Sequence, residues 1–292
     1  ALVNAGGPWV NDIIGRVTGT NSRRKVRLVK GSHIIVPKFW VGEQAYLVQN
    51  NDKRVIFINP YEGDKALIGT TDIPYEGAPE KVSAGEDEIT YLLAAVNRYF
   101  KQQLRRSDVV HSFSGVRPLY DDGAGNPSAV TRDYVFDLET TGAPILNVFG
   151  GKITTFRKLA EHGLQRLAAT FPKMGPDWTA KGALPGGDIP NADIPRFIDG
   201  LLRTYPWLPR DLAGHYTRLY GARTAKLIGN ATSLAALGRQ FGPHLYEAEA
   251  RYLIAHEWAQ TPEDILTRRT KHALHMTAAE QSAFADWFKA LP

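Results

Sequence analysis

The stretch that decides the fold is VFGGKITTFR, residues 148–157. It follows the apolar run ILNVF at residues 145–149, which has the length and bulk of a buried strand. After Gly150 and Gly151, apolar residues recur at helical spacing, at Ile153, Phe156, Leu159, Ala160, Leu164 and Leu167. The change of period at the glycines predicts a strand that turns directly into a helix.

Such a turn can bind an anion or an electron-rich ring edge. A helix start leaves backbone N–H groups without intrahelical partners and carries partial positive charge. Gly150 and Gly151 have no side chains to keep a ligand away from that backbone. Lys152 adds a full charge, and Thr154 adds a hydroxyl donor. The alternative is an ordinary strand-to-helix turn.

Composition limits the class of protein. The chain has 292 residues, of which 43% are hydrophobic and 22% charged, so a folded core in one large or two smaller domains is expected. No apolar run approaches the roughly 20 residues that span a bilayer. The absence of cysteine excludes disulfides and thiolate metal sites. The net charge is +5, and aromatic residues do not interleave with basic ones, so we expect no nucleic acid partner.

The order of elements predicts a sheet-rich part followed by a helical part. Residues 1–5 resemble the end of a buried strand, so we expect the chain to be a fragment. Residues 26–72 predict an antiparallel meander, and a capping box at residues 83–86 predicts a helix that continues to residue 104. Residues 109–115 and 131–136 predict further strands.

The division into domains follows from a change of composition. Residues 172–195 are rich in Pro, Gly and Asp and are predicted to be a linker between residues 1–171 and a helical domain of residues 196–292. The predicted helices after it are residues 195–204, 210–220, 222–228, 233–238, 245–258, 262–275 and 278–291, the last of which begins with the capping box TAAE.

Four residues at strand ends or corners are candidates for chemistry: His33, Arg117, Arg132 and Lys152. They stand among apolar residues, where an unpaired charge is costly, and no matching acids stand beside them. We therefore expect a bound phosphate or carboxylate to supply the negative charge. The alternative is that aspartates or backbone carbonyls pair with them. The histidines show no metal-ligand spacing with carboxylates, so no metal site is expected.

Several short segments, in order, resemble one enzyme family, the aerobic FAD-dependent glycerol-3-phosphate dehydrogenases. The segments are NAGGPW at 4–9, GSHI at 31–34, IGTTD at 68–72, SGVRPL at 114–119, TRDY at 131–134, FGGKITTFR at 149–157, LPGG at 184–187, HEWA at 256–259 and RRTK at 268–271. The resemblance implies an α+β or α/β, D-amino-acid-oxidase-like fold: part of an FAD domain and an antiparallel-sheet substrate domain, followed by an all-helical C-terminal domain. The family's G-x-G-x-x-G diphosphate fingerprint is absent, so we expect the C-terminal part of such an enzyme.

The resemblance implies oxidation of sn-glycerol 3-phosphate to dihydroxyacetone phosphate, with a hydride passing to flavin N5 and electrons passing to membrane quinone. Arg117 and Arg132 would bind the substrate, His33 would bind it and take or orient the hydroxyl proton, and Lys152 would join Arg117 and His33 as catalytic residues. The residues implied to contact FAD are Asn4, Gly6, Gly7, Gly150, Gly151, Lys152, Ile153 and Thr154.

The resemblance also implies a homodimer that is cytoplasmic and peripheral on the inner face of the cytoplasmic membrane, with the basic residues at 268–271 near that membrane or a subunit contact. Two alternatives stay open. One is a related flavin-dependent amino-acid or hydroxy-acid oxidase or dehydrogenase, in which Arg117 binds a carboxylate. The other is a non-catalytic fragment in which the helical part is an interaction domain.

Overall fold

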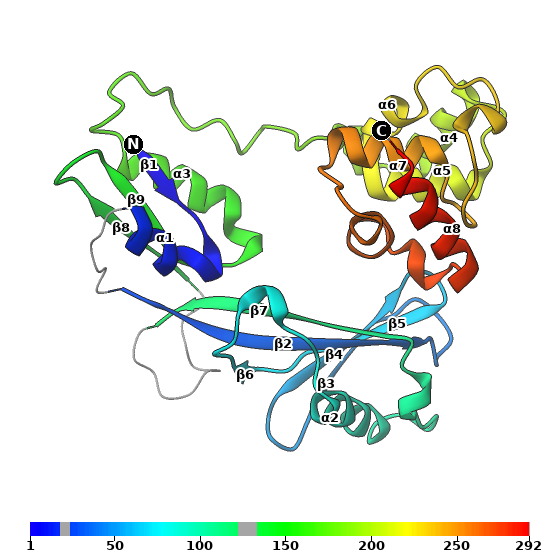
Figure 1. The fold of residues 1–292 in the computed structure, drawn as a ribbon, viewed down its shortest axis with the longest axis horizontal. Helices are drawn as coiled ribbons and strands as arrows, with labels where there is room; N and C mark the ends of the chain where they lie inside the picture. The colour runs from blue at the N-terminus through cyan, green and yellow to red at the C-terminus, as the bar shows by residue number, and fades with distance from the viewer. Residues whose placement is uncertain (18–23, 122–132, 292) are drawn as a thin grey trace. The chain divides into compact units, whose positions relative to one another are not determined.

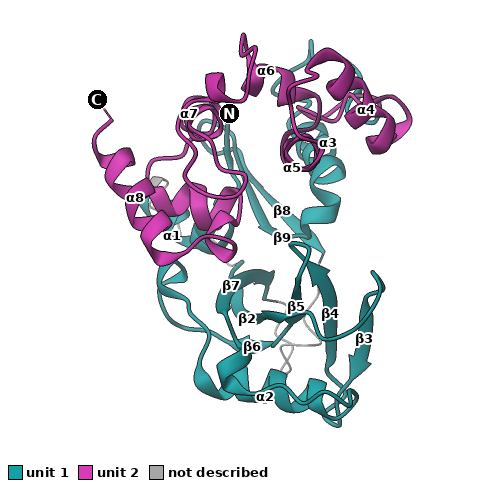
Figure 2. Cartoon of the chain, turned by 90° about the vertical axis from the view of Figure 1, so that its right-hand side faces the viewer, with its two compact units in different colours: residues 1–180 teal, residues 181–292 magenta. Residues whose placement is uncertain are grey.

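The computed structural model describes residues 1–17, 24–121 and 133–291. The chain divides into two compact units, Ala1–Ala180 and Lys181–Pro292 (Figure 2). The boundary at residue 180 lies inside the segment 172–195 that composition predicts to be a linker. No helix among the described residues is long and apolar enough to cross a membrane.

A three-stranded sheet in the first unit carries the stretch that decides the fold (Figure 1). The central strand β9 (Ile145–Gly150) pairs in parallel with β1 (Leu2–Asn4) and antiparallel with β8 (Tyr134–Glu139). The prediction of a strand followed by a helix is confirmed, because β9 ends at Gly150 and is followed by the 3-10 turn η5 (Ile153–Thr155) and by helix α3 (Phe156–Arg166).

Two helices cover opposite faces of this sheet. On one face, Phe149 packs against Val10 and Ile14 of α1 (Val10–Val17), which follows the 3-10 turn η1 (Gly7–Trp9). On the other face, Gly163 of α3 lies so close that a Cβ there would be 3.4 Å from the Leu146 side chain. Because side chains alternate along a strand, Leu146 and Phe149 point to opposite faces of β9.

The second sheet has six strands and is antiparallel throughout, as the meander predicts. Its longest strand, β2 (Val26–Pro37), pairs with β7 (His111–Tyr120) along one edge and with β5 (Lys65–Gly69) and β6 (Ile73–Pro74) along the other. Strands β4 (Val55–Tyr61) and β3 (Tyr46–Gln49) continue the sheet beyond β5.

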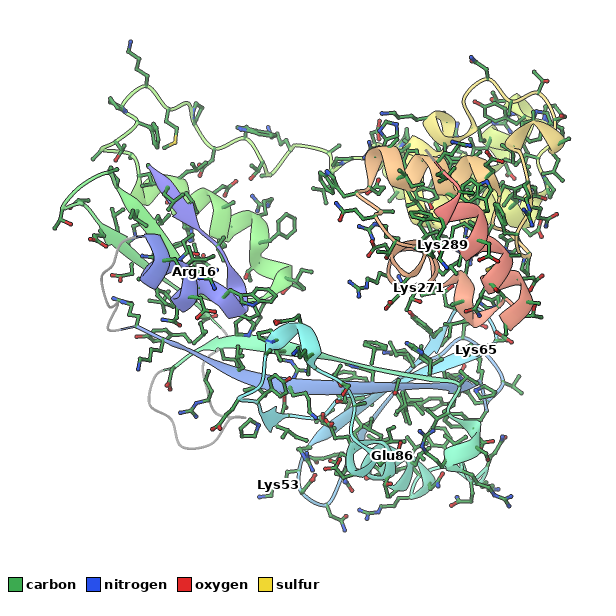
Figure 3. The ribbon with its side chains drawn as sticks, viewed as in Figure 1. Arg16, Lys53, Lys65, Glu86, Lys271 and Lys289 are labelled. Carbon is green, nitrogen blue, oxygen red and sulfur yellow. The ribbon has the colours of Figure 1, made fainter. Side chains whose placement is uncertain are left out.

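Helix α2 (Glu86–Asn97) covers one face of the second sheet (Figure 1), where branched aliphatic side chains of the strands meet those of the helix. The members of this core include Ile34, Val36, Ile56, Ile58, Ile68, Ile89, Leu92 and Val96. Two predictions about α2 are wrong. The helix ends at Asn97, not at residue 104, and its cap is Gly85, whose N–H donates to the Glu88 carboxylate at 3.0 Å. Glu86, labelled at the start of α2 in Figure 3, instead binds Arg106.

The second unit is helical, as predicted. Its α-helices are α4 (Ile194–Thr204), α5 (Arg210–Tyr220), α6 (Thr224–Ile228), α7 (Glu247–His256) and α8 (Ala278–Lys289). The predicted capping box before α8 is confirmed, since Thr277 Oγ1 accepts the Glu280 N–H at 3.3 Å and the Glu280 carboxylate accepts the Thr277 N–H at 2.7 Å.

Two of the predicted helices in this unit are wrong. Residues 262–275 form a π-helical turn η9 (Asp264–Arg269) and a 3-10 turn η10 (His272–Leu274), separated by Lys271 at φ +60°. Residues 233–238 contain only the 3-10 turn η8 (Ala235–Leu237). The remaining 3-10 turns of the described residues are η2 (Pro79–Lys81), η3 (Arg106–Asp108), η6 (Pro190–Ala192) and η7 (Gly221–Arg223).

Candidate functional site

The face of the second sheet opposite α2 carries His33 and Arg117. In β2, Ile34 and Val36 point toward α2, so the odd-numbered residues point to the other face. The pairing of β2 with β7 places His33 opposite Phe113, Gly31 opposite Gly115, and Val29 opposite Arg117. His33 and Arg117 therefore lie on one face, with Gly31 between them along β2.

The Arg117 guanidinium crosses β2 above Gly31 and reaches the segment that follows β5. Nη1 donates to the Asp72 carboxylate at 3.0 Å and to the Thr71 carbonyl at 3.3 Å, and Nη2 donates to Thr70 Oγ1 at 3.0 Å. A Cβ on Gly31 would lie 2.4 Å from both Nη atoms, so only glycine leaves room for this crossing. The side chain of Arg117 keeps 27% of its surface exposed.

The prediction that these cations have no acidic partners is wrong for Arg117. Asp72 stands 45 residues before Arg117 in the chain, and only the antiparallel pairing of the sheet brings them together. Lys30, from a basic cluster that the sequence places at residues 23–30, is also paired, because its Nζ lies 2.6 Å from the buried Glu88 carboxylate. Asp72 therefore supplies the negative charge that Arg117 needs, and no ligand is required for that purpose.

His33 is held by an aromatic stack and by a glycine. Its ring lies 5.1 Å from the Phe113 ring at an angle of 7°. A Cβ on Gly69 would lie 2.0 Å from His33 Cδ2, so glycine makes room for the imidazole. Nδ1 is buried and has no hydrogen-bond partner among the described residues. Burial, and secondly the charge of Arg117, lower the pKa of His33 below 6.5, which favours the neutral imidazole at neutral pH.

A buried carboxylate that sequence reasoning missed supports the Arg117 contacts from the other side of the sheet. Glu88 accepts hydrogen bonds from Ser32 Oγ at 2.6 Å and Thr71 Oγ1 at 2.7 Å, besides the bond from Lys30. Burial raises the pKa of Glu88, but the hydrogen bonds from Gly85, Lys30, Ser32 and Thr71 outweigh it and lower that pKa. The carboxylate of the predicted capping box, Glu86, stands two residues before Glu88, which caps the helix.

The glycine turn after β9 lies against the end of β7. Gly150 and Gly151 have φ of +71° and +98°, which side chains rarely adopt. A Cβ on Gly150 would lie 3.2 Å from the Tyr120 backbone nitrogen, and one on Gly7, at φ +53°, would lie 3.9 Å from Pro118 Cγ. The structure therefore brings Gly7 and Gly150 to the strand that carries Arg117.

The turn after β1 is shaped by hydrogen bonds within the protein. The buried Asn4 amide donates to Val10 O at 3.0 Å and to Asn147 Oδ1 at 2.9 Å, and its Oδ1 accepts the Gly6 N–H at 3.3 Å. A Cβ on Gly6 would lie 2.4 Å from Ile13 Cδ1. The Asn4 side chain thus holds the turn that presents Gly6 and Gly7.

Lys152, Ile153 and Thr154 are exposed at the start of η5, with 88% of Ile153 accessible. An exposed aliphatic side chain beside two glycines and a lysine offers a surface on which a planar ring edge can lie. Arg132, the second predicted substrate-binding arginine, lies outside the described residues.

These features fit part of a site for a flavin dinucleotide. At Gly150 a Cβ would lie 2.8 Å from the Asp133 carbonyl, so the turn requires glycine, and without a side chain its backbone stays accessible to a ligand. The η5 turn and the exposed Lys152 offer positive charge to a ring edge. The orphaned His33 Nδ1 is a buried polar atom on the face that would adjoin a substrate.

Comparison with known families agrees with this fit. Residues 1–157 match the family of FAD-dependent oxidoreductases, and residues 178–288 match the C-terminal domain of alpha-glycerophosphate oxidase. The chain therefore belongs to the FAD-dependent oxidoreductase family, and its fold is the D-amino-acid-oxidase-like fold with an antiparallel sheet and a helical C-terminal domain, as the sequence predicts.

Two relatives by sequence and one solved structure are similar to most of this chain. D-erythritol 1-phosphate dehydrogenase of Brucella abortus is 68% identical over 98% of this chain and 57% of its own length. Aerobic glycerol-3-phosphate dehydrogenase of Escherichia coli is 46% identical over the same shares. The structure of glycerol-3-phosphate dehydrogenase from Bacillus halodurans complexed with FAD is 26% identical, with a TM-score of 0.76, over 98% of this chain and 60% of that one. The chain thus spans between half and two thirds of these relatives.

Proposed function

We propose that the complete protein oxidises a secondary hydroxyl group of a polyol phosphate with FAD as the cofactor. The observation that carries this proposal is the placement of the His33 imidazole, whose pKa is lowered, and the Arg117 guanidinium on one face of the β2–β7 strand pair, whose other end meets the glycine turn of an FAD-dependent fold. A hydroxyl oxidation needs a proton acceptor and an anchor for the rest of the substrate, and these two side chains offer both.

The proposed roles follow from the geometry of each residue. FAD, when bound, supplies the acceptor for the hydride that leaves the substrate carbon. His33 accepts the hydroxyl proton, so the alcohol loses a hydride and a proton and becomes a ketone. The exposed part of Arg117 attracts the phosphate, while Asp72 and Thr70 hold the guanidinium in place. Arg132 is proposed as a second phosphate contact.

The cofactor contacts are proposed on the first sheet. The turn at Gly6 and Gly7, held by Asn4, and the cradle at Gly150 and Gly151 would admit the FAD backbone and ring edge. Lys152, with the N–H groups of Ile153 and Thr154, would offset negative charge that develops at the pyrimidine edge of the ring.

Two polyol phosphates compete as the substrate. The family resemblance suggests sn-glycerol 3-phosphate, giving dihydroxyacetone phosphate. The relative at 68% identity, against 46% for the glycerol-3-phosphate enzymes, favours D-erythritol 1-phosphate, and we favour that four-carbon substrate. A related amino-acid or hydroxy-acid oxidase is less well supported, because four relatives above 40% identity are each named for a polyol phosphate.

The proposal extends to what happens after reduction. Electrons would pass to membrane quinone from a homodimer that is peripheral on the inner face of the cytoplasmic membrane. The residues proposed to contact an acidic lipid surface are Lys271, which precedes η10, and Arg268, which is exposed although it lies 3.5 Å from Glu263. Binding to vesicles with and without anionic lipid would test that part by itself.

The central experiment compares substrates in the complete protein. We expect reduction of a dye acceptor with either polyol phosphate, no reduction with D-amino acids, and a higher kcat/KM for D-erythritol 1-phosphate than for sn-glycerol 3-phosphate. A higher value for the three-carbon substrate would reverse the choice of substrate. Turnover of D-amino acids alone would overturn the proposal.

A further inference from the structure

A cluster of titratable side chains is buried in the second unit. His215 of α5, Glu249 of α7 and His272 at the start of η10 point their polar ends at one another. His215 Nε2 lies 3.0 Å from Glu249 Oε1, and His272 Nε2 lies 3.1 Å from Glu249 Oε2. Their potential ligand atoms all lie within 4.8 Å of one another.

The carboxylate at the centre of this cluster needs a positive partner. Glu249 has no exposed surface, and a buried, uncompensated carboxylate is strongly destabilising. The compensating charge is either a proton on an imidazole or a cation between the three side chains.

The donor set and its spacing suit a transition-metal cation. Two imidazole nitrogens and a carboxylate are ligands that Zn²⁺, Co²⁺ and Fe²⁺ accept. With bonds of about 2.0–2.2 Å, neighbouring donors around such an ion lie about 3.0–3.5 Å apart. The 3.0 and 3.1 Å separations between the imidazole nitrogens and the carboxylate oxygens match that spacing. The widest separation in the set is 4.8 Å, so the ligands would move closer together around an ion.

The surroundings orient the ligands as metal sites require. Tyr220 Oη donates to Glu249 Oε1 at 2.7 Å and so fixes the carboxylate. The His215 ring stacks on His244 at 5.4 Å, and His244 in turn lies 3.1 Å from the Asp211 carboxylate. His215 is 16% exposed, which gives an ion a route into a cluster whose other two members are almost fully buried.

We propose that His215, Glu249 and His272 bind one divalent transition-metal ion that cross-links α5, α7 and the η10 turn. The ion is structural, because the cluster borders the aromatic core that includes Tyr216, Tyr220 and Tyr252. Neighbouring Lys271, labelled in Figure 3, adopts φ +60° and turns the chain so that His272 points inward. The spacings of 34 and 23 residues explain why the sequence predicted no metal site.

The test uses the whole chain, stripped with a chelator and titrated with Co²⁺. We expect visible absorption bands of protein-bound Co²⁺ that saturate at one equivalent, bleach when Zn²⁺ is added, and accompany a rise in the midpoint of thermal unfolding. The absence of such bands and of any thermal shift would show that a proton, not a metal, balances Glu249, and would overturn the proposal.

Variants locate the ion. His272→Gln and His215→Gln should each abolish the stoichiometric Co²⁺ bands, and Tyr220→Phe should weaken binding by about 10-fold or more. His256→Gln, which changes an exposed histidine at the end of α7, is the matched control and should bind as the wild type does. Bands that persist in both cluster variants would place the ion elsewhere. If one variant fails to fold, the other variant and the wild-type titration still decide.

Discussion

The Arg117 guanidinium lies directly over Gly31, where a Cβ would come within 2.4 Å of both terminal nitrogens. Arg117 thus reaches Asp72 across a strand that would otherwise block it. The arrangement makes a glycine in the middle of β2 a requirement of the site rather than a weakness of the strand.

We expect Gly31→Ala to push the flexible end of Arg117 off Asp72 and Thr70, and to destabilise the protein by about 1–3 kcal/mol through the loss of these charged hydrogen bonds. Its cross-strand partner Gly115 offers a matched control, because a Cβ there would meet no atom within 4 Å. Gly115→Ala should change the free energy of unfolding by less than about 0.5 kcal/mol. Urea unfolding of the two variants measures the difference, and equal effects would contradict the crossing described here.

Removal of the guanidinium should weaken binding of the phosphorylated substrate. In the complete protein, Arg117→Ala should cost about 2–5 kcal/mol in kcat/KM, because a charge partner of the phosphate is lost. Arg106→Ala serves as the control, since Arg106 is exposed and binds Glu86 at the start of α2. Steady-state kinetics give the comparison, and an unchanged KM and kcat in Arg117→Ala would remove Arg117 from the site.

The neutral imidazole of His33 predicts a pH dependence. A base must be unprotonated to act, and the pKa of His33 is lowered below 6.5 by burial and by Arg117. The acid limb of kcat/KM should therefore have its midpoint below pH 6.5. His33→Ala should lower kcat by about 10²–10⁴-fold and remove that limb. His111→Gln, in the same strand as Phe113, should keep it, and a loss of less than tenfold in His33→Ala would assign His33 to packing.

The buried Glu88 network predicts that the protein loses stability in acid. Because the pKa of Glu88 is lowered in the folded state, its contribution is fully present above its ordinary pKa of 4.5 and is lost as the pH falls through the lowered value. Glu88→Gln should destabilise the protein by about 1–3 kcal/mol at pH 7, where a hydrogen-bond acceptor is lost from Lys30, Ser32 and Thr71.

The same variant should also weaken the dependence of stability on pH below 4.5. Urea unfolding between about pH 3 and pH 7, an interval that brackets the ordinary carboxylate pKa values near 4, measures both effects. Glu86→Gln is the control, since Glu86 lies on the exposed end of the same helix. If both variants lose the same stability at pH 7, the buried network has no special role.

The sequence predicted those parts of the fold that depend on local pattern. The strand-to-helix turn at residues 148–157, the antiparallel meander and the capping box at Thr277 are local features, and each is confirmed. Apolar residues at helical spacing predict one continuous helix over residues 262–275. The structure instead has a π-helical turn and a 3-10 turn, because the positive φ of Lys271 interrupts the helix.

The partners of the site residues could not be predicted in the same way. Asp72 and Arg117 are 45 residues apart, and Lys30 and Glu88 meet only because α2 folds back over β2. No local pattern encodes which carboxylate faces which cation. What the sequence did indicate was the choice of residue types, since His33 and Arg117 do lie on one face, on either side of Gly31.

Strand β2 also makes unfolding of the first unit cooperative. Its first residue, Val26, packs beside Phe149, its fourth residue, Val29, packs with Leu119, and Ile34 and Val36 belong to the core under α2. One backbone thus passes through three separate clusters. Because β2 contributes to all three clusters, amide hydrogens in its centre should exchange with solvent only when the whole unit unfolds. A change that loosens one sheet should therefore reduce the cooperativity with which the two sheets unfold together.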